Sequence, residues 1–279
     1  MMKGIVLSDN RNSTVLPETE HGLSVYLDRG AYKVILDTGA SDLCIRNAQK
    51  LGLNLETLDY IFISHGHADH IGGLTALLEI NSKAKVILSP EALSQRFFSN
   101  RKSLREIGIQ LLADQYPGRF VFVNEDIFIE PDFQIIKPQK LGFPLPKGNR
   151  HLFKDSGKGM EPDDLNHELM ACFGTEESFV YCGCAHHGLL NILQSISNKT
   201  NKSIRAVLGG FHLLDSDEHN TYEIEKELAD LAEFLKTMYP DTRFYTGHCT
   251  GSEVYAFLKQ KLGAQLELFH TGYEIELTI

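Results

Sequence analysis

The chain has 279 residues, enough for one large domain or two small ones, and its 42% hydrophobic and 23% charged residues are ordinary for a globular protein. The net charge of -10 does not favour binding to nucleic acid phosphates. No apolar run approaches the roughly 20 residues that span a bilayer, and the N-terminus becomes polar too early for a signal peptide. The five cysteines form no disulfide framework, so we expect a protein of the reducing cytoplasm.

Predicted strands and short helices alternate in the first part of the chain. Apolar runs predict strands at residues 4–8, 23–27, 32–36, 59–63 and 85–88. Ser41 is a candidate helix cap and Gly52 a candidate stop, with apolar residues on one face between them. Leucines at helical spacing over residues 74–78 predict a second helix.

The middle of the chain is less regular. Residues 90–118 predict short helices with a basic surface, and short strands are expected at residues 120–123, 127–129 and 133–136. Residues 138–164 show no clear periodicity, and a loop of this length in a compact domain is commonly functional or mobile. Its basic residues are Lys140, Lys147, Arg150, Lys154 and Lys158. We interpret this insertion either as a solvated loop or as a basic lid over an anionic substrate.

The last part of the chain again alternates strands and helices. Strands are expected at residues 167–173, 178–181, 204–208, 244–245, 266–269 and 274–278. The strongest helical pattern extends to Met238, and the acidic residues 215–218 predict its start. Thr250 opens the last helix, where free N–H groups and the helix dipole attract phosphate. The whole pattern predicts one domain, residues 1–279, of two packed sheets with helices outside.

The densest group of metal-ligating residues is His65-Gly66-His67-Ala68-Asp69-His70. It lies between a predicted strand and a predicted helix, where a tight turn can fold several side chains around one point. Neutral imidazole and carboxylate are good ligands for zinc, iron(II) and manganese. Four such ligands at this density are hard to explain as core or as solvated surface, so they predict a metal site.

The cluster suits one ion or two. In an extended turn, His65 and His67 would face one ion, and Asp69 and His70 a second; a single ion held by three or four of them is the simpler alternative. Two ions about 3.5–4 Å apart would lower the pKa of a shared water, or clamp a phosphate or carbonyl oxygen. Histidines at later strand ends offer further ligands: His186, His187, His212 and His248.

The cluster, with Asp37-Thr38-Gly39 upstream and Gly72-Gly73-Leu74 downstream, resembles the metallo-β-lactamase superfamily. The resemblance implies an α/β fold, the αββα sandwich of two mixed β-sheets flanked by helices, with the metals at one edge. It also implies that Asp37 orients the histidine turn and that His248 is the last histidine ligand.

Further motifs resemble one branch of this superfamily, the dihydropterin–ribofuranosylaminobenzene-phosphate synthase-like proteins, often described simply as metal-dependent hydrolases. These motifs cover residues 20–24, 183–186, 209–213 and 247–251. In the branch, a Gly-Cys-(Ser/Ala)-His turn follows the strand where other members carry a bridging aspartate, which implies His186 rather than His187 as a ligand. His212 is a candidate proton donor, substrate contact or extra ligand.

Together these features predict a metal-dependent hydrolase with two divalent ions, zinc first and iron or manganese as alternatives. Its substrate would be small, anionic and phosphorylated; neither nucleic acid nor a membrane is an expected partner, and an oligomer is compatible with the sequence. Asp69 would double as a proton shuttle beside a catalytic His212. The expected substrate contacts are His21, Lys147, Arg150 and Thr250.

Other functions stay open at this point. The branch name implies a transferase that joins a pterin pyrophosphate to an aminobenzene ribofuranosyl phosphate. The same ligand set would also suit a di-iron redox protein or a metal-binding protein without catalytic activity.

Overall fold

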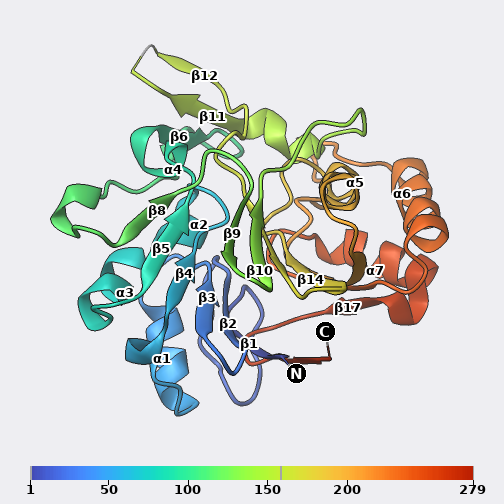
Figure 1. Ribbon diagram of the computed structural model, residues 1–279. Coiled ribbons are helices and arrows are strands. Elements are labelled where there is room, and N and C mark those ends of the chain that lie inside the picture. The colour runs from blue at the N-terminus through green and yellow to red at the C-terminus, as the bar shows by residue number, and fades with distance from the viewer. Residues whose placement is uncertain (1, 158, 279) are drawn as a thin grey trace. The chain divides into compact units, whose positions relative to one another are not determined.

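The computed structural model describes residues 2–157 and 159–278, which form two compact units (Figure 1). Unit 1 comprises residues 2–127, 151–169 and 270–278, and unit 2 comprises residues 128–150 and 170–269. Each unit contains a mixed sheet and helices, as the sequence predicts. The organisation of residues 1–279 as a single domain stays a prediction.

Unit 1 is built on a sheet whose described residues form seven strands. In spatial order these are β18 (Glu274–Leu277), β1 (Met2–Ser8), β2 (Ser24–Asp28), β3 (Lys33–Leu36), β4 (Tyr60–Phe62), β5 (Lys85–Leu88) and β8 (Phe120–Phe122). Strands β18 to β3 pair antiparallel, whereas β3, β4, β5 and β8 pair parallel. Because β3 and β4 are parallel neighbours, the residues that follow them emerge at the same edge of the sheet.

Helices α1 (Leu43–Lys50) and α3 (Leu74–Ile80) pack on one face of this sheet (Figure 1). Ile35, Ile61 and Val86, one from each of three neighbouring strands, join the leucines of α3 in one apolar core. Burying each such side chain contributes about 1.5–3 kcal/mol. The short helices η1 (Leu55–Thr57), α2 (Ala68–Ile71) and α4 (Glu91–Ser94) complete this part of the unit.

A small sheet in unit 1 corrects two sequence interpretations. Its strands are β12 (Met160–Pro162), β11 (Leu152–Asp155), β6 (Arg96–Ser99) and β7 (Arg105–Glu106). Residues 90–118 therefore hold two strands beside α4 and η2 (Ala113–Gln115), rather than helices alone. The insertion 138–164 also has regular structure, namely η3 (Lys147–His151), β11 and β12. Its strands are only three or four residues long, and Lys154 points inward beside Asp164, so the polar alternation that identifies a strand is missing.

Unit 2 is built on a second sheet, again with seven strands among the described residues. The spatial order is β17 (Leu266–Leu268), β16 (Arg243–Thr246), β15 (Ser203–Leu208), β14 (Glu177–Tyr181), β13 (Met170–Phe173), β10 (Phe133–Ile136) and β9 (Ile127–Glu130). Strands β14 to β17 are parallel. The turns that follow β14, β15 and β16 therefore share one edge of this sheet.

Three helices pack on the sheet of unit 2: α5 (Leu189–Lys199), α6 (Glu225–Met238) and α7 (Ser252–Leu262), the last continued by η4 (Gly263–Gln265). The predicted start of α6 at residues 215–218 is wrong. The helix begins at Glu225, and the Glu227 carboxylate accepts the Ile224 N–H at 2.8 Å. Asp215 instead caps α7, where its carboxylate accepts N–H groups of Ser252, Glu253 and Val254 at 2.7–3.0 Å.

Candidate metal centre

The histidine turn of unit 1 links β4 to α2, and it buries three imidazoles. His65, His67 and His70 are 0%, 3% and 0% exposed. Glycines allow the turn to pack closely, since a Cβ at Gly73 would lie 2.4 Å from the Thr38 carbonyl oxygen. The turn is therefore fixed against residues 37–41, which follow the neighbouring strand β3.

Asp37 connects these two turns. Its Oδ1 accepts the Ser64 N–H at 2.6 Å, and its Oδ2 lies 2.6 Å from both Ser64 Oγ and His70 Nδ1. Asp37 is fully buried and has a left-handed backbone (φ 56°), an uncommon conformation that persists only where the surroundings enforce it. Because a carboxylate only accepts, Nδ1 of His70 carries the proton and Nε2 keeps its lone pair. This contact is the one expected of a residue that orients a metal ligand.

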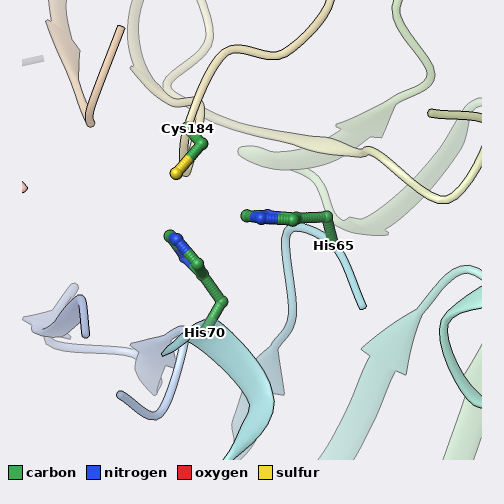
Figure 2. A group of neighbouring side chains, drawn as sticks. All are labelled: His65, His70 and Cys184. Carbon is green, nitrogen blue, oxygen red and sulfur yellow. The ribbon is translucent and has the colours of Figure 1, made fainter. Parts of the chain in front are cut away.

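His65 and His70 lie close together at the sheet edge. Their ring centroids are 4.1 Å apart, and Figure 2 shows the two side chains converging from the turn and from α2. Nδ1 of His65 lies 2.9 Å from Ser64 Oγ, so this nitrogen is engaged by the protein. In His65 and His70 these contacts use Nδ1, so Nε2 is the candidate metal-binding atom of each ring.

His67 is engaged through its other ring nitrogen. Its Nε2 lies 3.4 Å from Asp163 Oδ2, so Nδ1 is the candidate metal-binding atom. The ring of His67 is 4.6 Å from that of His65, centroid to centroid. The turn thus places imidazoles side by side, and each has one nitrogen engaged by a neighbouring oxygen.

Asp163 and His167 also contact the histidine turn, and neither is among the residues predicted from the sequence. The His167 ring is 5.9 Å from that of His65 and 5.2 Å from that of His67. Its Nδ1 accepts the Gly66 N–H at 2.9 Å, so this nitrogen is unprotonated and Nε2–H donates to Asp163 at 3.1 Å. His167 therefore contacts the turn that carries the candidate ligands.

Electrostatics keep the Asp163 side chain ionised although it is fully buried. Burial alone would raise the pKa of Asp163, but the His167 and His67 side chains that face it outweigh burial and hold this pKa well below its usual value. Burial also lowers the pKa of His167, in agreement with the neutral tautomer that its hydrogen bonds require.

Asp69 occupies the more open side of the turn, and its side chain is 22% exposed. One of its oxygens lies 3.9 Å from Nε2 of His70 and 3.4 Å from Nε2 of His21. The His21 side chain is 60% exposed. Asp69 thus lies between a candidate metal ligand and an imidazole in contact with solvent.

Unit 2 carries the remaining predicted histidines on adjacent turns. His186 follows β14, His212 follows β15 and His248 follows β16. Left-handed backbone occurs in all three turns, at Ala185 (φ 54°), His212 (φ 49°) and His248 (φ 48°). The rings of His186 and His212 are 4.3 Å apart, and Nδ1 of His186 lies 2.9 Å from Asn149 Oδ1. Both ring nitrogens of His212 are buried and form no hydrogen bond with the other described residues.

The predicted substrate contacts of unit 2 are engaged within the protein. The prediction of free N–H groups at the start of α7 is wrong, because Asp215 accepts them. Thr250 Oγ1 accepts the Phe211 N–H at 3.0 Å and lies 2.7 Å from Thr246 Oγ1.

The predicted cations of the insertion have partners of their own. The Lys147 ammonium lies 2.5 Å from Glu227, and the Lys154 ammonium lies 2.6 Å from Asp164. The Arg150 guanidinium lies 5.0 Å from the centre of the Tyr222 ring. Lys158 lies outside the described residues. A role for Lys147 and Arg150 in substrate binding stays a prediction.

The donor chemistry fits a divalent metal ion. Unit 1 presents three imidazoles and one carboxylate, the ligands that zinc, iron(II) and manganese share, with oxygens engaging the second nitrogen of each imidazole. His186 and His248, the ligands that the family resemblance adds, belong to unit 2, and their part in the ligand set stays a prediction. No helix among the described residues has the length and apolar character to cross a membrane.

These features define an α/β protein with a candidate metal centre, and comparison with known proteins identifies its family. Residues 18–229 match the family model of the metallo-beta-lactamase superfamily, so the chain belongs to this superfamily. It is 28% identical over 275 residues to 7,8-dihydropterin-6-methyl-4-(beta-D-ribofuranosyl)-aminobenzene-5'-phosphate synthase of Methanocaldococcus jannaschii, covering 91% of this chain and 89% of that protein. The branch resemblance predicted from the motifs is thereby confirmed.

Solved structures agree on the fold. A metal-dependent hydrolase of the beta-lactamase superfamily superposes with a TM-score of 0.82 at 28% sequence identity, and the match covers 100% of both chains. A diphosphatase from the PhnP family matches with a TM-score of 0.54 at 17% identity, over 100% of this chain and 99% of that one. The chain therefore has the metallo-β-lactamase fold, as predicted, and the superfamily implies that it binds divalent metal.

Proposed function

We propose that this protein is a metal-dependent enzyme of hydrolase type whose divalent ions bind at the histidine turn. The observation that carries the proposal is the way the turn holds its ligands. Asp37, Ser64 and Asp163 each engage one nitrogen of His70, His65 and His67, respectively. A histidine that merely filled the core would not need this arrangement, whereas a metal ligand needs both a fixed tautomer and a fixed ring orientation.

The donors of the turn support two ions, with zinc as the first choice. The His65 ring lies near those of both His67 and His70, with centroids 4.6 and 4.1 Å away, and the Asp69 carboxylate lies 3.9 Å from Nε2 of His70. Four donors this close together can serve two ions, and we keep the predicted division into His65 with His67 and Asp69 with His70. A divalent ion at such a site supplies Lewis acidity, which polarises a substrate oxygen and makes water more acidic. Imidazole with carboxylate is a typical zinc ligand set, and iron or manganese are alternatives.

Asp69 and His21 would move the proton that the reaction releases. Asp69 accepts it at a carboxylate oxygen, and His21, 3.4 Å away and largely exposed, transfers it to solvent. His212 is a second catalytic candidate in unit 2, because an imidazole with two buried nitrogens and no hydrogen bond to the other described residues is available as a proton donor.

The substrate we propose is a small phosphate ester. Support comes from the M. jannaschii relative, whose name includes a 5'-phosphate product. The similarity to that relative extends over 91% of this chain. The same relative supports a second candidate function, a synthase reaction that condenses a pterin with an aminobenzene ribofuranosyl phosphate. The two candidates share the metal site and differ in the group that attacks.

A panel assay distinguishes these functions. The protein, freed of metal and then reloaded with zinc, manganese or iron(II), is supplied with phosphate monoesters, phosphodiesters and a pterin pyrophosphate with an aminobenzene acceptor. We expect metal-dependent phosphoester hydrolysis that falls at least about 100-fold in a His65→Ala/His67→Ala variant. Condensation without hydrolysis would favour the synthase. A metal-loaded protein that turns over no substrate in the panel would contradict both.

A further inference from the structure

Two cysteines of unit 2 lie against each other at the edge that carries the histidines. Cys184 is on the turn after β14 and Cys249 on the turn after β16, and their sulfur atoms are 3.2 Å apart. The two residues are 2% and 8% exposed. Cys184 is one of the three side chains drawn in Figure 2.

Imidazoles surround this thiol pair within the same unit. The donor atoms of Cys184, His186 and His212 all lie within 4.8 Å of one another, and so do those of Cys184, His248 and Cys249. The backbone N–H of His212 also donates to the Cys249 sulfur at 3.2 Å. Two sulfurs and several imidazole nitrogens at such spacing are the donor set of a zinc or iron site.

The other cysteines of unit 2 have different surroundings. Cys172 and Cys182 belong to the apolar core beneath α5 and α7, where a thiol acts as a small hydrophobic group.

We propose that Cys184 and Cys249 are sulfur ligands for a bound metal ion, alongside His186 and His248 of the same unit. This inference rests on the proposed function, because it assumes that the protein binds metal. It also specifies which metal ions the ligands prefer. Thiolate is a soft ligand that suits zinc and iron(II) and disfavours magnesium and manganese, which prefer oxygen ligands. Binding releases the thiol protons to solvent as the metal–sulfur bonds form, and no oxidant or reductant is needed.

Cobalt(II) is the probe for this ligand set, because thiolate coordination produces an intense sulfur-to-cobalt charge-transfer band in the near ultraviolet, and imidazole or carboxylate coordination does not. The metal-free protein, kept reduced with a phosphine, is titrated with cobalt(II). We expect the band in the wild-type protein, weaker in Cys184→Ser and in Cys249→Ser, and absent in the double variant. Zinc affinity should fall by at least about tenfold in each single variant.

The matched controls are Cys172→Ser and Cys182→Ser, buried thiols of the same unit that should keep the band. The wild-type spectrum tests the inference even if a variant fails to fold. Bound cobalt without the band, or a band that persists in the double variant, would overturn the sulfur ligands and leave the proposed function standing. A wild-type protein that binds no cobalt and no zinc would overturn the proposed function together with this inference.

Discussion

Asp37→Asn is expected to lower zinc affinity by about 10- to 100-fold, the usual cost of losing a group that orients a metal-bound histidine. Asparagine tolerates the left-handed backbone at this position, so the substitution isolates the change in hydrogen bonding. Its amide can still accept the Ser64 N–H, but it then presents N–H groups toward His70. Nδ1 of His70 would become the acceptor, and the proton would move to Nε2, the nitrogen that the metal requires.

The measurement is a competition titration of metal-free protein with a zinc chelator, at a temperature where both proteins are folded. Asp42→Asn is the matched control, because Asp42 is an exposed carboxylate that pairs with Arg46 on α1, and such surface pairs contribute about 0–1 kcal/mol. Zinc affinity of Asp37→Asn within a factor of about two of the wild type would show that Asp37 does not orient a ligand.

Asp163→Asn is expected to reduce both stability and metal affinity. The Oδ1 of Asp163 accepts the Leu165 N–H, and its Oδ2 accepts from His167, so an asparagine leaves one of these buried donors without an acceptor. We expect the free energy of unfolding to fall by roughly 3 kcal/mol, as when one partner of a buried charged hydrogen bond is removed. Because His67 loses the group that faces its Nε2, zinc affinity should also fall about 10-fold or more.

Urea unfolding gives the stability change, and zinc titration of the folded protein gives the affinity. Glu161→Gln is the control, a carboxylate of the same segment that is 55% exposed and 3.8 Å from Lys154. A variant that loses stability but binds zinc like the wild type would assign Asp163 to folding alone. An unchanged free energy of unfolding would mean that the buried contacts of Asp163 are not formed in solution.

The sequence predicted those parts of the site that local chemistry specifies. The spacing of His65, His67 and His70 between a strand and a helix identified the turn, and the glycines after it were consistent with its close packing on residues 37–41. The parallel strands of both sheets, which carry these turns at their ends, were found because their apolar runs are continuous. Most predicted strands agree with the structure within a few residues.

Contacts between distant segments were not predictable in the same way. Asp163 and His167 are about 100 residues from the histidine turn, and their only local signal is the four-residue spacing of a carboxylate and an imidazole. Asp163 lies near the end of the segment without periodicity, and His167 lies at the start of the predicted strand 167–173. Asp215 looked like the cap of the next helix along the chain, but it caps α7, which begins at Ser252. Lys154 was predicted to lie in a solvated loop or a basic lid, but it is buried beside Asp164. In each case the tertiary fold determines which residue the side chain contacts.

The most direct test of the account is a zinc-binding isotherm of the metal-free wild-type protein beside the His65→Ala/His67→Ala variant, by equilibrium dialysis with elemental analysis. We expect the wild type to saturate with two zinc ions per chain, and the folded variant to lose at least one of them. A wild-type chain that retains no zinc, iron or manganese, or a variant that binds as much zinc as the wild type with the same affinity, would contradict a metal centre at the histidine turn.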